Sequence, residues 1–168
     1  MKNRNTDILF TVITVVKNRE TDIVNNITSV SEQSISNNIE HLLIDGRSTD
    51  LTLRKIKCTP SNAQKKVITE LDSGIYDALN KGFGLARGRY MAVLHSDDIF
   101  KDEKVLEDVY NTFTATGAEI VYTNVEVYDR QGLYKGQVKP APRVNNKGYP
   151  TQIAHMGMFL SRKAAQNI

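Results

Sequence analysis

The sequence predicts an α/β fold in which a mainly parallel sheet is flanked by helices. Apolar runs suited to strands alternate with segments whose apolar residues recur at helical spacing, and this alternation is typical of βαβ units. With 168 residues, of which 40% are hydrophobic, the chain is long enough for one sizeable core. We therefore expect residues 1–168 to form a single domain.

The first two thirds of the chain carry these patterns. Ile8–Val16 is a β-branched run typical of a buried strand, and the segment 21–33 has an apolar helical face, with its polar residues expected to face solvent. Further strands are expected at 39–44, 66–70 and 90–94, and helices after the capping residues 48–50, over 74–87 and over 104–116. Gly88 should end the helix before it.

The pattern changes toward the C-terminus. Residues 120–128 alternate as one strand that should turn at 129–132, which predicts a small antiparallel β element. The stretch 138–150 contains three prolines and few apolar side chains, which favours a loop or lid. Ser161–Ile168 has the pattern of the first turns of a helix, and we expect its apolar face to fray or to be buried in a homodimer contact.

Composition and charge exclude several classes of function. The 22 basic and 19 acidic residues are spread along the chain, without the basic block typical of a nucleic-acid-binding arm. Cys58 is the only cysteine, which excludes an intrachain disulfide and favours a reducing, cytoplasmic location. Because no segment approaches the roughly 18 consecutive apolar residues of a membrane span, any association with the inner face of the membrane would be peripheral.

Carboxylates follow two of the expected strands. Asp45 comes directly after Ile44, and Asp97 and Asp98 follow the strand that ends at Leu94. The carboxyl ends of parallel strands meet at one edge of a sheet, so these acids should share a crevice. Two adjacent carboxylates repel unless a cation lies beside them, and Mg²⁺ or Mn²⁺ prefers such oxygen ligands. The alternative is that Asp97 and Asp98 cap the next helix or form a polar turn.

Two further acids allow a binding role or a local structural one. The Asp45 carboxylate could accept a hydrogen bond from a ring N–H of a nucleotide base, or it could form an Asx-turn before Gly46. Asp72 could contact a ligand, or it could cap the helix that begins near Gly74. Local pattern alone leaves both alternatives open for each residue.

Four motifs stand in an order that resembles family 2 glycosyltransferases of the GT-A fold, which are inverting enzymes. They are Thr11-Val-Ile-Thr-Val-Val-Lys-Asn18, Ile44-Asp-Gly-Arg-Ser-Thr-Asp50, Asp72-Ser-Gly-Ile-Tyr-Asp-Ala-Leu-Asn-Lys-Gly82 and Ser96-Asp-Asp98. The resemblance spans almost the whole chain and is similar to the bacterial branch that builds capsule, exopolysaccharide and O-antigen chains. It implies a GT-A, Rossmann-like sheet and a nucleotide-sugar ligand.

The resemblance implies a role for each matching residue. The segment around Thr14 should line the base pocket, Asp45 should bind the uracil or other base, and Asp72 should be a second nucleotide contact. Asp97 is similar to the residue that contacts the ribose, and Asp98 to the one that ligates the Mn²⁺ or Mg²⁺ bridging the donor diphosphate. Lys81 falls near the family's phosphate-binding segment, although a solvated helix face is the competing interpretation. His155 could approach the metal or the acceptor, or it could be structural.

The sequence departs from the family pattern at two places. Arg47 stands where this branch usually has a second glycine, so a bulky cation enters a turn near the expected base. The family's general base lies beyond a His-containing segment that matches His155–Phe159, and this chain ends at Ile168. We therefore expect a C-terminally truncated GT-A domain. Glu126 and Asp129 are the remaining downstream acids, and surface strand and turn roles are expected for them.

These observations support a metal-dependent transfer of a hexose from a UDP-sugar to a saccharide or lipid-linked acceptor in surface polysaccharide synthesis. The main alternative is a truncated or non-catalytic domain that binds a nucleotide sugar without transferring it. A sugar nucleotidyltransferase is a third hypothesis, but it needs a glycine-rich phosphate loop after the first strand. Val16–Glu20 contains no glycine, which argues against that class.

Overall fold

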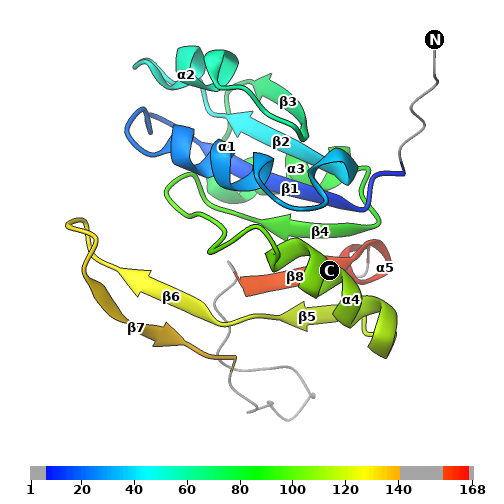
Figure 1. Cartoon of the computed structure of the whole chain (residues 1–168). Helices are drawn as coiled ribbons and strands as arrows, with labels where there is room; N and C mark the ends of the chain where they lie inside the picture. The colour runs from blue at the N-terminus through cyan, green and yellow to red at the C-terminus, as the bar shows by residue number, and fades with distance from the viewer. Residues whose placement is uncertain (1–6, 141–156, 167–168) are drawn as a thin grey trace.

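The computed structural model describes residues 7–140 and 157–166, in which six strands form the main sheet. The strand order is β3-β2-β1-β4-β8-β5 (Figure 1). The strands are β1 (Phe10–Val16), β2 (Ile39–Asp45), β3 (Gln64–Thr69), β4 (Tyr90–Val93), β5 (Ile120–Tyr122) and β8 (Met158–Ser161). The first four pair in parallel, whereas β8 runs antiparallel to both β4 and β5. The predicted α/β architecture is therefore confirmed.

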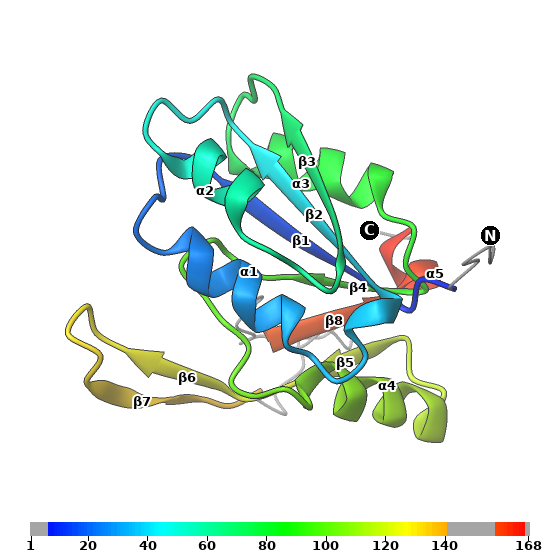
Figure 2. The same ribbon diagram turned by 45° about the horizontal axis from the view of Figure 1, so that its top comes forward.

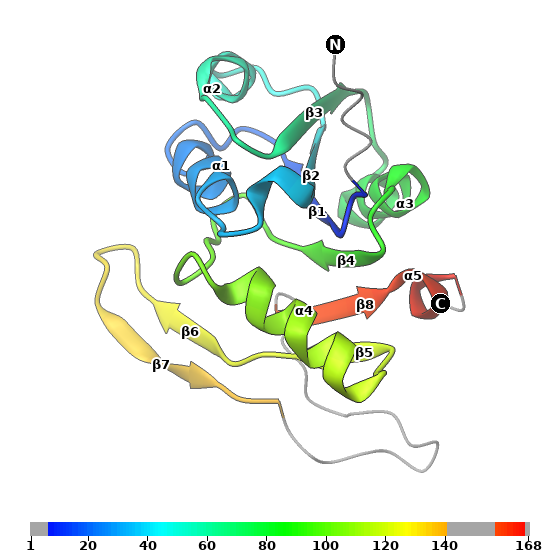
Figure 3. The same cartoon turned by 45° about the vertical axis from the view of Figure 1, so that its right-hand side comes forward.

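Helices cover both faces of this sheet (Figures 2 and 3). They are α1 (Ile23–Ser31), α2 (Thr52–Cys58), α3 (Ile75–Leu85), α4 (Val105–Thr116) and α5 (Arg162–Ala165), and a 3₁₀ turn η1 (Ser36–Asn38) precedes β2. Helices α1, α2 and α4 lie on one face, and α3 and α5 lie on the other. None of the helices in the described ranges is long and apolar enough to cross a bilayer.

The core forms where the β-branched strands meet the helices. Every residue of β2 is buried, as is all of β1 except the partly buried Val15, which explains the largely apolar sequence of β1. In β2 the buried residues include the polar Glu40, His41 and Asp45. One cluster joins β1, β4 and β8 to α1 and α4 through residues such as Phe10, Phe113 and Phe159. A smaller cluster on the opposite face joins Leu42 and Met91 to α3 and α5.

The segment predicted as one strand at 120–128 forms two strands in different sheets. β5 pairs with β8, whereas β6 (Val125–Tyr128) pairs with β7 (Tyr134–Val138) in a separate two-stranded sheet. The break lies at Thr123, whose backbone N–H donates to Gly157 O at 2.8 Å. The turn predicted at 129–132 is confirmed: Asp129 N donates to Leu133 O at 3.0 Å, and Gly132 has a φ of 78°.

Two expectations about helix ends are wrong. Helix α3 ends at Leu85, three residues before Gly88, which instead lies against the backbone of β1. The expected exposed face after Ser161 is also not observed within the described residues, because Ala164 is buried and Ala165 packs against the cluster around Leu42. Most of the expected loop at 138–150, and His155, lie outside the described residues.

Candidate functional site

The loops that follow β1, β2, β3 and β4 lie at the same edge of the sheet, because these four strands are parallel. Figure 2 shows these loops beyond the arrowheads of β1 and β2. The first two are tied together: Asn18 N donates to Ser48 Oγ at 2.9 Å, and Thr49 N donates to Asn18 Oδ1 at 2.9 Å. Asn18 and Arg47 both have a positive φ, at 52° and 57°.

Asp45 is the last residue of β2, and its side chain is fully buried. Ser48 N donates to both carboxylate oxygens at 3.2 Å, and Ser48 Oγ donates to Oδ1 at 2.5 Å. The carboxylate thus bonds the residue three positions on, and not the residue two positions on as in the Asx-turn expected as an alternative role. A carboxylate has about four lone-pair positions, so these bonds leave one position unused, although Asp45 has no exposed surface.

Asp72 is brought next to Asp45 by the loop after β3. A Cβ atom placed on Gly46 would lie 2.5 Å from Asp72 Oδ2, so the Asp72 carboxylate lies directly against this glycine. The alternative that Asp72 caps α3 is wrong, because the cap position is Gly74 and it carries no side-chain bond. Two motifs that are far apart in the sequence thus bring Asp45 and Asp72 close to the same residue, Gly46.

Lys81 reaches from α3 to the same loop. Its ammonium donates to Leu71 O at 3.0 Å and lies 3.5 Å from Glu70 Oε2 and 3.4 Å from Asp77 Oδ2. Desolvation acts against its charged form, but the two carboxylates prevail and raise the pKa of Lys81. In this arrangement Lys81 fastens the segment that carries Asp72, and its contact with a phosphate stays a prediction.

Asp97 and Asp98 form a turn after β4, closed by a 3.0 Å bond from Asp98 N to His95 O. The Asp97 side chain is exposed and that of Asp98 is partly buried. Neither carboxylate caps α4, whose cap position is Lys104. The polar turn that was expected as an alternative is therefore present, and a ligand contact of either carboxylate stays a prediction.

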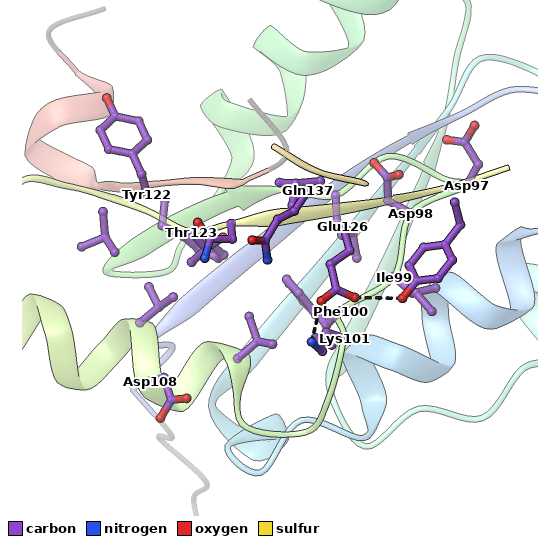
Figure 4. A pocket seen from close by; sticks show the side chains of 18 of the residues that line it. Asp97, Asp98, Ile99, Phe100, Lys101, Asp108, Tyr122, Thr123, Glu126 and Gln137 are labelled. Carbon is purple, nitrogen blue, oxygen red and sulfur yellow. Dashed lines mark hydrogen bonds and ion pairs between the residues drawn. The ribbon is translucent and has the colours of Figure 1, made fainter. Parts of the chain in front are cut away.

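A cavity of about 850 Å³ opens beside this pair, between α4 and the strands β5 and β6. Figure 4 shows Asp97 and Asp98 at one end and Asp108 and Tyr122 toward the other. Glu126 also lines it, although a surface strand role was expected. Glu126 accepts bonds from Lys101 Nζ at 2.6 Å and Tyr128 Oη at 2.8 Å, and the bond from Lys101 lowers the pKa of Glu126.

The turn role expected for Asp129 is confirmed. Its Oδ1 accepts from Gln131 N and Leu133 N at 3.0 and 2.9 Å, and its Oδ2 lies 2.8 Å from Lys135 Nζ. Asp129 is therefore committed to the β6–β7 hairpin. Arg47, in the loop after β2, is exposed.

Thr14 lies in the middle of β1 and is fully buried, facing α1. Its hydroxyl bonds Asn26 Oδ1 at 3.3 Å and His41 Nε2 at 3.0 Å. Burial, assisted by the charge of Lys65, lowers the pKa of His41 from 6.5 to about 3, so this ring is neutral. Sequence reasoning missed His41 and Asn26. The signal for His41 was that it and Thr14 are polar residues on neighbouring strands, at positions that face the same side of the sheet.

The acidic pair suits a divalent cation that shares its coordination with a ligand. Mg²⁺ and similar hard cations are often held by one or two carboxylates, with phosphate oxygens and water completing the shell. No cluster of three or more His, Cys, Asp or Glu residues capable of holding a metal occurs in ranges 7–140 and 157–166.

Residues 11–166 match the family model described as "Glycosyl transferase family 2". The chain belongs to this family. Among its relatives, it is 31% identical over 94 residues to "Succinoglycan biosynthesis protein ExoO" of Rhizobium meliloti, an alignment that covers 56% of the chain and 27% of that protein. It is 28% identical over 123 residues to "Glycosyltransferase GlyG" of Streptococcus pneumoniae, covering 72% of the chain and 40% of that protein.

Solved structures of other glycosyltransferases share the fold of this family 2 chain. TarS 1–349 of S. aureus superposes with a TM-score of 0.74 at 18% identity, covering 95% of this chain and 48% of TarS. The same protein with UDP-GlcNAc gives 0.63 at 23% identity, covering 67% and 33%. Mannosyltransferase PcManGT of Pyrobaculum calidifontis, solved with GDP-Man and Mn²⁺, gives 0.60 at 21% identity, covering 73% and 36%. These likenesses confirm the GT-A fold.

The matched region is only part of the relatives. The family 2 chain spans less than half the length of ExoO, GlyG, TarS and PcManGT. Its activity, donor and acceptor are therefore a matter for proposal.

Proposed function

We propose that this chain binds a UDP-sugar at the carboxyl edge of its sheet and transfers the hexose, with inversion, to a saccharide or lipid-linked acceptor in surface polysaccharide synthesis. The observation that carries this proposal is the family match over residues 11–166, whose acidic motifs converge on one edge of the sheet. Related folds bound to UDP-GlcNAc, UDP and GDP-Man support a nucleotide-sugar donor. A relative named for succinoglycan biosynthesis supports a polysaccharide product.

The donor nucleotide is proposed to lie across the ends of β1 and β2. Asp45 is fixed by Ser48 with a lone pair left for a base N–H. Asp72, next to Gly46, is the proposed second nucleotide contact. Asp97, which is exposed after β4, is the proposed ribose contact, and the segment around Thr14, whose own side chain is buried, is proposed to back the base pocket.

Asp98 is proposed to hold Mn²⁺ or Mg²⁺ together with the donor diphosphate. The cation would neutralise the negative charge that develops on the leaving diphosphate. The chain's own contribution is to fix Asp98 in the turn closed by its bond to His95 O. Glu126 is tied to Lys101 and Tyr128, and its lowered pKa makes it a weak proton acceptor. We therefore assign Glu126 to the wall of the cavity.

A titration with UDP-, GDP- and dTDP-sugars, each with and without Mn²⁺, tests this proposal. We expect calorimetric binding of the UDP-sugars, strengthened by Mn²⁺. Equal affinities for the three nucleotide sugars, unchanged by Mn²⁺, would contradict the proposed site. Release of UDP that depends on an added acceptor would distinguish transfer from binding alone.

Replacing Asp45 should weaken nucleotide binding to a similar extent with and without metal. The Asp45→Ala variant loses a charge-assisted hydrogen bond to the base, which costs about 1.5–3 kcal/mol, or roughly 10- to 150-fold in Kd. Ser48→Ala is the matched control, because it loses the bond from Ser48 Oγ to the Asp45 carboxylate but keeps that carboxylate. Equal UDP affinities of Asp45→Ala and the parent in calorimetry would rule out the base contact.

Asp98→Asn should remove the metal-dependent part of donor affinity and leave the fold intact. The amide keeps the shape of the carboxylate but loses the charge that holds a hard cation. In the parent, nucleotide at 100 times its Kd should add about 2.7 kcal/mol of stability, seen as a thermal shift that grows with Mn²⁺. Asp108→Asn makes the same charge change at the other end of the cavity, and its shift should equal that of the parent (Figure 4). A full Mn²⁺ effect in Asp98→Asn would exclude the ligand role.

A further inference from the structure

One face of α1, together with the turn that follows it, carries polar side chains that face the chain after β4. Asn26 and Gln33 are buried, and Ser29 is partly buried, although the sequence pattern placed the polar residues of this helix toward solvent. Ser29 Oγ accepts from Phe100 N at 3.3 Å. Gln33 donates to Asp102 O at 2.7 Å and accepts from Leu106 N at 3.0 Å. Helix α1 and the turn after it therefore hold the chain after β4 at three positions, through Asn26, Ser29 and Gln33.

Asn26 bonds the turn that carries Asp97 and Asp98. Its Nδ2 donates to His95 O at 2.8 Å and to Asp98 O at 2.9 Å. These two carbonyls flank Asp97, and the turn between them is closed by Asp98 N. Both N–H groups of the buried amide are thus used on the backbone of the turn. A change in the position of this amide would move the turn as a unit.

The orientation of Asn26 is in turn fixed from the sheet. Carbonyl oxygens can only accept, so the Asn26 nitrogen must face the turn and its Oδ1 must accept from Thr14 Oγ1. The single hydroxyl hydrogen of Thr14 is then used, and His41 Nε2 must donate to Thr14 Oγ1. This assigns the proton of the neutral His41 ring to Nε2, and Nδ1 is the atom left without a partner.

We propose that Asn26 is a positioning residue that holds Asp97 and Asp98 in the geometry required for the donor and its metal, with Thr14 and His41 fixing the Asn26 amide. This inference rests on the proposed function, because it assigns the acidic pair to a metal-bound donor. It adds Asn26 on α1, which contacts the acidic turn, and His41 on β2, and it gives the buried Thr14 on β1 a supporting role in the core. None of their side chains needs to touch the ligand.

The test compares Asn26→Ala with Gln33→Ala. Both variants remove a buried amide that bonds the segment after β4, Asn26 from α1 and Gln33 from the turn after it, but only Asn26 contacts the acidic turn. Asn26→Ala should reduce the gain in UDP affinity caused by Mn²⁺ by about 10- to 100-fold, the loss typical when an outer partner of a metal ligand is removed. Its metal-free UDP affinity should fall much less, because in the absence of metal only the ribose contact proposed for Asp97 depends on this turn. Gln33→Ala should keep the full Mn²⁺ gain even though it lowers the melting temperature.

A second readout needs neither nucleotide nor metal. Amide hydrogen exchange of Asp98 N–H should be much faster in Asn26→Ala than in Gln33→Ala, because the turn that it closes has lost its support. Unchanged exchange at Asp98, or a retained Mn²⁺ gain, would overturn the proposal. If the parent itself shows no Mn²⁺ gain, the proposed function fails, and the exchange result alone decides whether Asn26 holds the turn.

Thr14→Val provides the same test if Asn26→Ala does not fold. The substitution preserves the shape of the side chain and removes only the hydroxyl that orients the Asn26 amide. We expect it to lower the Mn²⁺ gain and to speed exchange at Asp98, both to a smaller extent than Asn26→Ala. A Thr14→Val protein indistinguishable from the parent in both measurements would overturn the roles of Thr14 and His41.

Discussion

Acidification should destabilise this chain more steeply than its His41→Leu variant, by about 1.4 kcal/mol per pH unit. Burial and the charge of Lys65 lower the pKa of His41 from 6.5 to about 3 in the folded state. Between these values the unfolded chain binds a proton that the folded chain does not. The stability present above pH 6.5 is therefore lost progressively as the pH falls, and the loss levels off near pH 3.

Urea unfolding at a series of pH values measures this difference. Other titrating groups are shared by the two proteins, so they cancel when the free energy of unfolding of His41→Leu is subtracted from that of the parent. Above pH 6.5 the difference should be constant, because it then reports only the lost bond to Thr14 and the change in packing. Parallel stability curves at acidic pH would mean that His41 can be protonated without unfolding.

Gly88→Ala should destabilise the fold by about 3 kcal/mol or more, at the upper end of overpacking effects. A Cβ atom at this position would lie 2.3 Å from Thr11 N, 2.5 Å from Phe10 C and 2.8 Å from Tyr90 O. All three atoms belong to the backbone of central strands, so none can move aside as a flexible side chain would. Gly88 N also donates to Thr11 Oγ1 at 2.8 Å, and this bond would be strained.

Gly84→Ala is the matched control for this substitution. Gly84 lies in α3, where a Cβ atom would meet nothing within 4 Å, so alanine should stabilise the helix by about 0.5–1 kcal/mol. The two variants should therefore shift the urea midpoint in opposite directions. A Gly88→Ala protein as stable as the parent would show that β1 and the α3–β4 connection can separate without cost.

The sequence predicted those parts of the fold that depend on local pattern. The parallel strands and the long helices follow from apolar periodicity, and the hairpin turn follows from Asp129 and Gly132. The division between β5 and β6 could not be predicted in the same way. It depends on Gly157, which is distant in sequence and approaches Thr123 so closely that a Cβ atom there would lie 2.7 Å from Thr123 O.

The site was predictable to the extent that it lies at strand ends. Asp45, Asp97 and Asp98 follow apolar runs, and parallel topology places such residues at one edge. Asn26 was missed because the helical pattern of α1 was judged by its apolar residues alone, and a buried amide has no apolar signal. Glu126 was assigned to the surface because nothing in its local sequence indicates the cavity formed with α4.

The insertion of β8 between β4 and β5 sets the order in which the chain can fold. Met91 pairs with Leu160, and Ile120 pairs with the same residue from the other side, so three strands depend on a contact of high sequence separation. Loop-closure entropy opposes such contacts until late in folding, which slows the final step. During synthesis, one backbone edge of β4 stays unpaired until β8 has been made. An unpaired strand edge can form hydrogen bonds with a strand of another chain, which favours aggregation. Helices α1 and α4 pack over this part of the sheet, and their residues leave the ribosome before those of β8. They can therefore cover the apolar face of β4 before β8 is available.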